Sequence, residues 1–363
     1  MKKRFRKLLS AISVLVLTVA MLPVYGTDVK AATVSGHVLK NPVKESSNTE
    51  WDCVWFGSYP QAEVIPSSTY TALSSRLLLE GDIIVSDEIY NKLIRAKDFD
   101  WNENGDIRLD GEYYRRIKKS DATLVTAMAG QVTAPLGDSL ETYQWDSDSE
   151  YHYFKYEPIK WRVLDVTEND VLLLADKGLD DPSESCDIDY WENSGIRSWL
   201  NGDSSKNFIK AAFSTPERSI IKTTERTEGT TTVSDNVFLL SESDVSVASY
   251  GFNNDNTSYN SARLSRSSTF AKAMGTVTDT DTISALYGYS PWLLSSVYYS
   301  PANRGGPGHF MQYCVTKGTV IAPINSWLKM CVGRCAVRPA LHIDLSSSSK
   351  VCTYAGTVNS NGK

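Results

Sequence analysis

The pattern of apolar and polar positions predicts short strands arranged largely as hairpins. Two apolar runs flank the polar turn 168–170, which is typical of a hairpin. A second hairpin is expected over 99–117, where Asn104 and Gly105 form the commonest short turn signal. Strands are predicted at 51–61, 160–164, 171–174, 237–241, 292–294 and 336–344.

Helix signals are concentrated in the middle of the chain, between 190 and 221. Ser194 can cap a helix start, and Ile196, Trp199 and Leu200 then share one apolar face. Further helices are predicted from Ser205, from Thr215, over 86–96 and over 268–275.

Strands outnumber helices and occur in hairpins, which predicts an α+β fold with antiparallel sheets, short helices and long loops. No linker-like stretch divides the middle of the chain, so a single domain is expected at 51–345. Residues 32–50 are polar and predict a flexible lead-in. Residues 346–363 are rich in Ser, Gly and Asn and predict a frayed tail.

The first 31 residues have the pattern of a secretory signal peptide. A basic start precedes an apolar run, and Val29 and Ala31 are the small residues expected before a cleavage site. The alternative is a retained membrane anchor, for which the run is short. Cleavage removes six basic residues and one acidic one, so the formal net charge changes from -6 to about -11. An acidic secreted chain of this kind argues against nucleic acid or an anionic membrane as a partner.

Five short motifs occur in an order that resembles a known family. They lie at 54–61, 158–164, 191–201, 238–241 and 337–341. Together they resemble an uncharacterised domain of Gram-positive secreted and cell-surface proteins, which has no assigned activity. That pattern is in turn similar to C-type-lectin-like folds, including the relatives that generate formylglycine. Two lectin landmarks are altered, because Ala336 replaces a glycine and Leu294 replaces an arginine.

Six cysteines in an exported chain permit disulfides with many connectivities. In lectin-like folds the first and last strands pair, so the resemblance implies a bridge between Cys53 and Cys352. Cys331 and Cys335 are the second expected pair, provided that Gly333 turns the chain between them. Zinc is disfavoured because this close pair has no second pair beside it.

Three further patterns bear on chemistry, and none predicts a cofactor. The segment 100–107 resembles the start of a calcium loop, but Gly111 stands where the final Glu ligand belongs. His309 follows a glycine-rich loop without a nucleophile motif. Cys331 and Cys335 could hold copper in a lectin-fold oxidase only as free thiolates.

An aromatic cluster is the best candidate for recognition. Its predicted ligand-binding residues are Trp292, Tyr298, Tyr299, Asn303 and Arg304. Aromatic rings stack on sugars or on partner side chains, while Asn and Arg supply directed hydrogen bonds. The competing interpretation places Trp292 in the core.

We therefore expect a secreted or cell-surface binding module that is not an enzyme and that recognises a surface glycan or protein. The alternative is a lectin-fold enzyme, either an oxidase using Cys331 and Cys335 or a hydrolase using His309.

Overall fold

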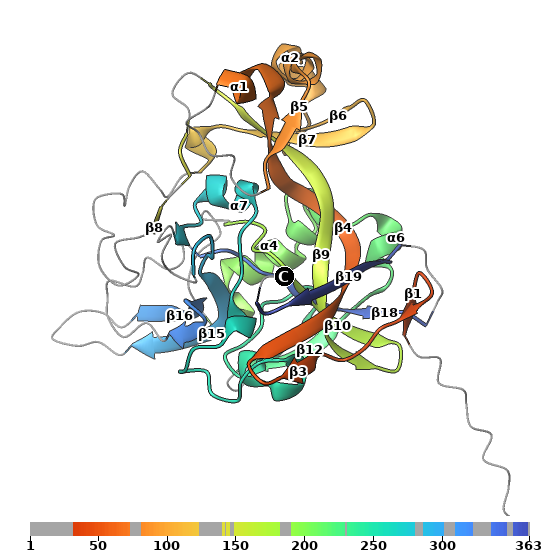
Figure 1. Cartoon of the computed structure of the whole chain (residues 1–363), viewed down its shortest axis with the longest axis vertical. Coiled ribbons are helices and arrows are strands. Elements are labelled where there is room, and N and C mark those ends of the chain that lie inside the picture. The colour runs from red at the N-terminus through yellow and green to blue at the C-terminus, as the bar shows by residue number, and fades with distance from the viewer. Residues whose placement is uncertain are drawn as a thin grey trace, which may run out of the picture.

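A computed structural model shows a mixed α+β fold built mostly from antiparallel sheets (Figure 1). It describes residues 32–72, 81–122, 140–141, 143–145, 149–181, 190–228, 231–279, 286–300, 309–321, 335–346 and 351–361. The expected signal peptide, 1–31, lies outside this set. Two long strands, β4 (Asn48–Pro66) and β9 (His152–Thr167), pair with each other and run through the whole molecule.

The main sheet has the strand order β11-β18-β10-β9-β4-β19, and each neighbouring pair is antiparallel. One face of β4 and β9 carries the fully buried Val54, Trp161 and Val163. The other strands of this path are β10 (Asp170–Ala175), β11 (Ile221–Lys222), β18 (Ala340–Asp344) and β19 (Thr353–Asn359). The hairpin predicted around 168–170 is confirmed as β9–β10.

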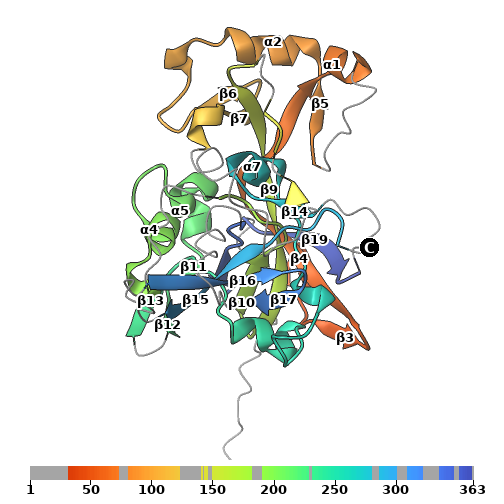
Figure 2. The same cartoon turned by 90° about the vertical axis from the view of Figure 1, so that its left-hand side faces the viewer.

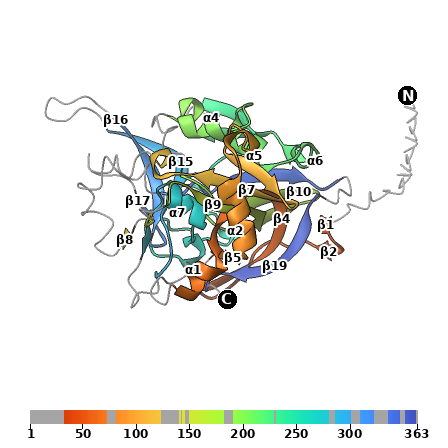
Figure 3. The ribbon, with the colours of Figure 1, turned by 90° about the horizontal axis from the view of Figure 1, so that it is seen from above.

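Three short helices cover the core face of the sheet (Figure 3): α4 (Gly195–Asn201), α5 (Phe208–Ala212) and α6 (Thr215–Arg218). Phe213 packs against the rings of Phe56 and Trp161, at centroid distances of 5.0 and 6.2 Å. Gly57 has φ +71°, and a Cβ there would lie 2.6 Å from the Phe213 ring. A glycine is therefore required for the close approach of β4 to this block.

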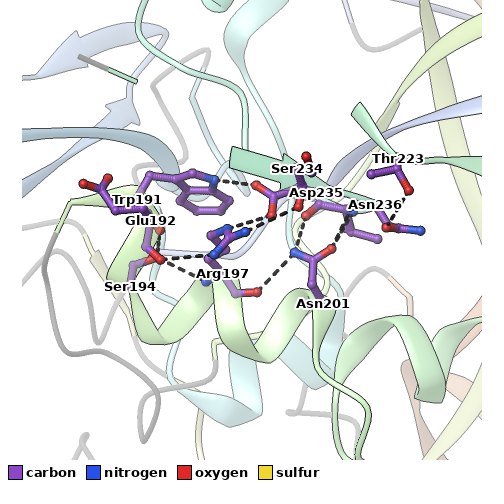
Figure 4. A network of polar contacts seen from close by, with 10 residues as sticks. Trp191, Glu192, Ser194, Arg197, Asn201, Thr223, Ser234, Asp235 and Asn236 are labelled. Carbon is purple, nitrogen blue, oxygen red and sulfur yellow. Dashed lines mark hydrogen bonds and ion pairs between the residues drawn. The ribbon is translucent and has the colours of Figure 1, made fainter. Parts of the chain in front are cut away.

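The motif at 191–201 is a structural clamp within this block (Figure 4). The buried Asp235 accepts hydrogen bonds from Trp191 Nε1 at 2.8 Å and Arg197 Nε at 2.7 Å. Asn201 Oδ1 accepts from the backbone of Asn236 and Val237. These bonds tie Trp191 and α4 to the end of β13 (Thr231–Asp235) and the residues after it, which explains Arg197 and Asn201 of the motif without a ligand.

Residues 237–241, predicted as a strand, are buried and form no strand in the structure; among the described residues their one bridge joins Phe238 to Ala340. Helix α7 (Thr269–Met274) begins after Ser268 and ends at Gly275, as predicted. The other small sheets are formed by β1 (Thr33–Val34) with β2 (His37–Val38), β12 (Thr224–Glu228) with β13, β8 (Leu140–Glu141) with β14 (Thr278–Asp279), and β15 (Trp292–Ser300), β16 (His309–Thr316) and β17 (Thr319–Ile321).

Beyond the body, β4 and β9 continue into a smaller upper lobe (Figure 2). There β9 pairs with β7 (Glu112–Ile117), and β4 pairs in parallel with β5 (Ile83–Val85). The lobe also contains α1 (Ser67–Ala72), α2 (Asp87–Arg95) and β6 (Asp106–Leu109). Its own core consists of Val64, Leu93, Trp101, Tyr114 and Tyr153.

The predicted turn of the lobe's hairpin is wrong by several residues. The turn between β6 and β7 uses Asp110 and Gly111, at φ +52° and +92°, which suits a two-residue hairpin turn. Asn104 and Gly105 instead form a turn before β6, where Asn102 Oδ1 accepts from the backbone N–H of Asn104. The segment thus contains two turn signals, Asn104-Gly105 and Asp110-Gly111. The second lies between residues of higher strand propensity and forms the hairpin.

Both segments expected outside the domain are parts of the fold. Strand β19 lies within the predicted tail 346–363 and pairs with β4, while the predicted lead-in 32–50 forms β1, β2, β3 (Val43–Glu45) and the start of β4. The strand ending at Asp344 is not the neighbour of β4, because β18 lies between β10 and β11. Strand β19 is an edge strand of mostly half-buried residues, so it carries no strong hydrophobic pattern.

The expected bridge between Cys53 and Cys352 is not present, because both are free thiols in the core. Thr353 pairs with Trp55, which places Cys352 opposite Phe56. Three residues along a strand span about 10 Å, more than the Cα separation that a disulfide allows. Burial raises the pKa of each thiol to about 12. Cys331 lies outside the described residues, and Cys335 is buried.

Candidate functional site

Of the five residues in the expected aromatic cluster, the structure describes the side chain of Trp292. Trp292 is 1% exposed, donates its indole N–H to the Arg263 carbonyl at 2.9 Å and packs under the guanidinium of Arg338. It is therefore a core residue. Tyr298 and Tyr299 lie in β15, but their side chains are outside the described set, as are Asn303 and Arg304 altogether. Ligand binding by those four residues stays a prediction.

The structure describes some of the other candidate chemical sites but not all of them. In the calcium-like segment 100–107, two carboxylates already have protein partners. Asp106 pairs with Arg115, and Asp100 accepts a hydrogen bond from the Lys97 backbone N–H. His309 begins β16, and its side chain is not described. Among the described residues, no group of three or more His, Cys, Asp or Glu is placed to hold a metal ion.

A cleft of about 580 Å³ lies where the upper lobe meets the body. Strands β4 and β7, helices α4 and α7, and the segment after β10 all contribute to it. The residues that line this cleft are Tyr59, Asn102, Glu103, Asn104, Gly105, Arg115, Arg116, Ile117, Lys118, Asp121, Tyr151, Asp180, Trp199, Lys206, Phe270 and Met274. Its lining is thus both aromatic and polar, and it is drawn from distant parts of the chain.

Asp180 lies at the floor of the cleft, on a segment that forms backbone hydrogen bonds with Val337. Leu179 N–H donates to the Val337 carbonyl, and Val337 N–H donates to the Asp180 carbonyl. Gly178 permits this packing, because a Cβ there would lie 2.2 Å from the Ala336 Cβ. The terminal motif at 337–341 therefore helps to position a carboxylate of the cleft.

The carboxylate of Asp180 is bonded within the floor. Tyr59 Oη donates to Asp180 Oδ2 at 2.5 Å, and the Asp181 N–H donates to Asp180 Oδ1 at 2.7 Å. Burial raises the pKa of Asp180. Burial, and then the charge of Asp180, raises the pKa of Asp181 well above its usual value. The carboxyl of Asp181 is 0% exposed, and neither of its oxygens has a hydrogen-bond partner among the described residues.

Arg115 supplies the positive charge of the floor. Its guanidinium binds Asp106 through Nε at 2.7 Å and Nη2 at 2.9 Å, and Nη2 also donates to Tyr156 Oη at 2.6 Å. It lies over the rings of Tyr59 and Phe270, at 5.7 and 5.8 Å. Burial opposes its charge, but the bond to Asp106 keeps its pKa above the ordinary value. Arg115 from the lobe thus packs on rings from the body.

Aromatic side chains also form the walls of the cleft. Tyr151 and Trp199 are both partly exposed. Arg116 lies between the rings of Trp101 and Tyr151, at 4.8 and 4.6 Å. Asn104 Nδ2 donates to the Ser205 carbonyl at 3.0 Å, which joins the lobe to the loop between α4 and α5.

Such an arrangement suits a polar ligand that has flat apolar faces. The rings can stack, and the amides, the lysines and the carboxylates at the rim can hydrogen-bond. Sequence reasoning missed this cleft. The one local signal was the pair of carboxylates Asp180 and Asp181, which lie five and six residues after the buried strand β10, where burial perturbs pKa values.

Comparison with known proteins adds little about function. Residues 168–345 match a domain family described as a domain of unknown function, DUF6273. No curated protein and no solved structure matches the chain. The matched region supplies β10, β11, β18 and the helical block, while β4, β9 and β19 lie outside it. Within the described parts of the chain, no helix is long and apolar enough to cross a membrane.

Proposed function

We propose that this protein is a secreted or cell-surface binding module that holds a glycan in the cleft between its upper lobe and its body. The observation that carries the proposal is the lining of the cleft. Tyr151 and Trp199 offer partly exposed rings, and Asn102, Asp121 and Lys206 offer exposed polar groups. Sugars present apolar ring faces and hydroxyl edges, which match this combination.

Export is part of this proposal and rests on the sequence of residues 1–31. The C-type-lectin-like architecture and the Gram-positive origin are also proposals. The pairing of β4 with β19 supports the lectin-like assignment, because it brings an early strand beside the last strand of the chain. The ordered motifs at 54–61, 158–164, 191–201, 238–241 and 337–341 support the origin.

The test is binding of the mature chain to an array of glycans and peptidoglycan fragments, with and without calcium. We expect selective binding that weakens about tenfold or more in Trp199→Ala, because a central aromatic anchor often carries this much affinity. Phe99→Ala is the matched control, since that ring is 84% exposed and lies outside the cleft. No binding to any glycan, or equal losses in both variants, would contradict the proposal.

A second candidate function follows from the floor of the cleft. Asp180 is a buried carboxyl whose pKa is raised by burial, and a carboxyl that acts as a general acid needs a raised pKa. The alternative is therefore a hydrolase that cleaves the bound glycan. Product analysis after prolonged incubation decides between them. Cleavage that Asp180→Asn abolishes, with binding retained, would favour the hydrolase.

A further inference from the structure

A second pocket lies on the other side of the segment that carries Asp180. It has a volume of about 280 Å³ and lies between strands β9 and β19 and the residues around 261–266. Asp176 reaches this pocket, whereas Asp180, four residues further on, reaches the cleft. We call it the basic pocket, because the charged residues described in its lining are Lys160, Arg162, Lys177 and Arg266, with Asp176 as the one carboxylate among them.

Among the described residues that line the basic pocket, Asp176 is the one carboxylate, and it is already engaged. Arg162 Nε donates to Asp176 Oδ1 at 2.7 Å. Although burial disfavours its charge, the guanidinium of Arg162 holds the pKa of Asp176 below its usual value, and Arg338 and Lys160 act in the same direction. In the described part of the chain, neither Lys160 nor Lys177 forms an ion pair.

Arg338 increases this excess of positive charge from within the core. It is 0% exposed, and its charge interacts with those of Arg162 and Asp176. Its Nε donates to the Ala175 carbonyl at 2.7 Å. Nη1 and Nη2 have no hydrogen-bond partner among the residues that the structure describes. A buried cation that is incompletely paired is costly, so nearby negative charge would stabilise this region.

The shape and the remaining lining restrict the anion. Ligand pockets commonly span about 300–1,000 Å³, so a volume of about 280 Å³ suits a small molecule rather than an oligosaccharide. Ser261 and Thr357 place hydroxyl-bearing residues in the wall. Arg266 lies over the ring of Tyr289 at 4.8 Å, which aligns one guanidinium of the pocket.

We propose that the basic pocket binds a phosphate group, carried on a small sugar or polyol. Arginine and lysine together are the side chains that proteins use for phosphate, because guanidinium groups bind its oxygens in pairs and ammonium groups add charge. The hydroxyl-bearing wall then faces the carbon skeleton. This site is separate from the cleft and does not depend on the glycan proposal.

Isothermal titration of the purified protein at low ionic strength tests this assignment. The probes are inorganic phosphate, glycerol 3-phosphate, glucose 6-phosphate, sulfate and glycerol. We expect saturable binding of the phosphate compounds, which weakens as salt is added, and no binding of glycerol. Tighter binding of the two esters than of inorganic phosphate would show that the carbon skeleton is also recognised.

Matched variants locate the binding. Lys177→Gln and Arg266→Gln should each weaken it by about tenfold, because each removes a hydrogen bond to a charged group. Lys97→Gln removes one positive charge from the exposed surface of the upper lobe and should leave the phosphate affinity unchanged. Trp199→Ala should also leave it unchanged, which separates this site from the cleft.

Several results would overturn the proposal. The absence of saturable binding for every phosphate compound would do so, as would sulfate binding more tightly than phosphate. Retention of full affinity in both Lys177→Gln and Arg266→Gln would place any binding elsewhere. Unfolding midpoints measured for each variant without ligand show whether a loss of affinity reflects a loss of structure.

Discussion

The body and the upper lobe share two strands but differ greatly in the core that each one buries. The body's core extends from Ala32 to Cys352 and includes the rings of Trp51, Trp161 and Trp191. Among the described residues, the lobe buries a small cluster around Leu93 and Trp101. A cluster of that size contributes little stability alone, so the lobe depends on the continuation of β4 and β9.

This difference explains why the cleft lies at the junction. The body supplies the rigid floor, with Tyr59 and Asp180 held in its sheet and its central segment. The lobe supplies Arg115 and the turn before β6. A ligand in the cleft would contact both parts and would stabilise the lobe against the body.

The largest expected effect comes from removing a core ring of the body. Trp161→Ala should lower the free energy of unfolding by about 3–5 kcal/mol, because it leaves a large cavity beneath the sheet. Trp101→Ala should instead loosen the lobe, with a smaller effect on global unfolding. Urea denaturation followed by circular dichroism, combined with amide hydrogen exchange, separates the two. Equal global losses would mean that the lobe and the body unfold as one unit.

Two adjacent arginines test how far the junction depends on a buried charge pair. Arg115→Leu should cost about 3 kcal/mol or more, since it leaves Asp106 buried without its cation. Arg116→Leu should cost less than about 1 kcal/mol from its ion pair, because the Asp98 carboxylate is 91% exposed. Urea midpoints measure both. Similar losses in the two variants would show that the buried pair has no special role.

A smaller effect is expected in the pH dependence of stability. The pKa of Asp181 is raised in the folded protein by burial and by Asp180, whereas an unfolded Asp titrates near about 3.9. The folded state therefore holds a proton that the unfolded state releases, and stability falls as the pH rises above about 4 towards the folded pKa.

Asp181→Asn should flatten this dependence, because the amide cannot ionise. Asp203→Asn is the control, since Asp203 is exposed and its pKa is lowered by a hydrogen bond from Lys210. Urea midpoints between pH 4 and 8 are the measurement. An unchanged pH profile in Asp181→Asn would mean that this carboxyl does not hold a proton in the folded state.

The smallest expected effect concerns two thiols of the body, which should not react with an alkylating reagent in the folded protein. Burial raises the pKa of Cys53 and Cys352 to about 12, so neither is a thiolate near neutral pH. Iodoacetamide should label both only after unfolding, which peptide mapping detects. Recovery of a peptide that joins Cys53 to Cys352 would instead restore the expected disulfide.

Local signals predicted local structure well. The helix predicted over 86–96 is α2, which Ser86 caps and which buries Leu93. The helix starts after Ser194 and Ser268 are also in place. In the helix predicted from Thr215, which is α6, the capping residue is Ser214, because its side chain and Glu217 form a reciprocal capping box.

Long-range arrangement could not be predicted in the same way. Tyr59 and Asp180 are 121 positions apart, yet one hydrogen bond joins them at the floor of the cleft. No periodicity relates such residues, because strand order decides which ones meet. The pairing of β19 with β4 was missed for the same reason, and that error also misplaced the expected disulfide.

The most direct test of the cleft follows the tryptophan indole N–H signals by NMR during titration with a disaccharide-peptide fragment of peptidoglycan. The signal of Trp199, in the cleft wall, should shift with saturation. The signal of Trp292, which donates to the Arg263 carbonyl in the core, should not move. Saturable shifts in the backbone amides of Tyr298 and Tyr299 with no change at Trp199 would contradict the cleft and support the aromatic cluster of β15 instead.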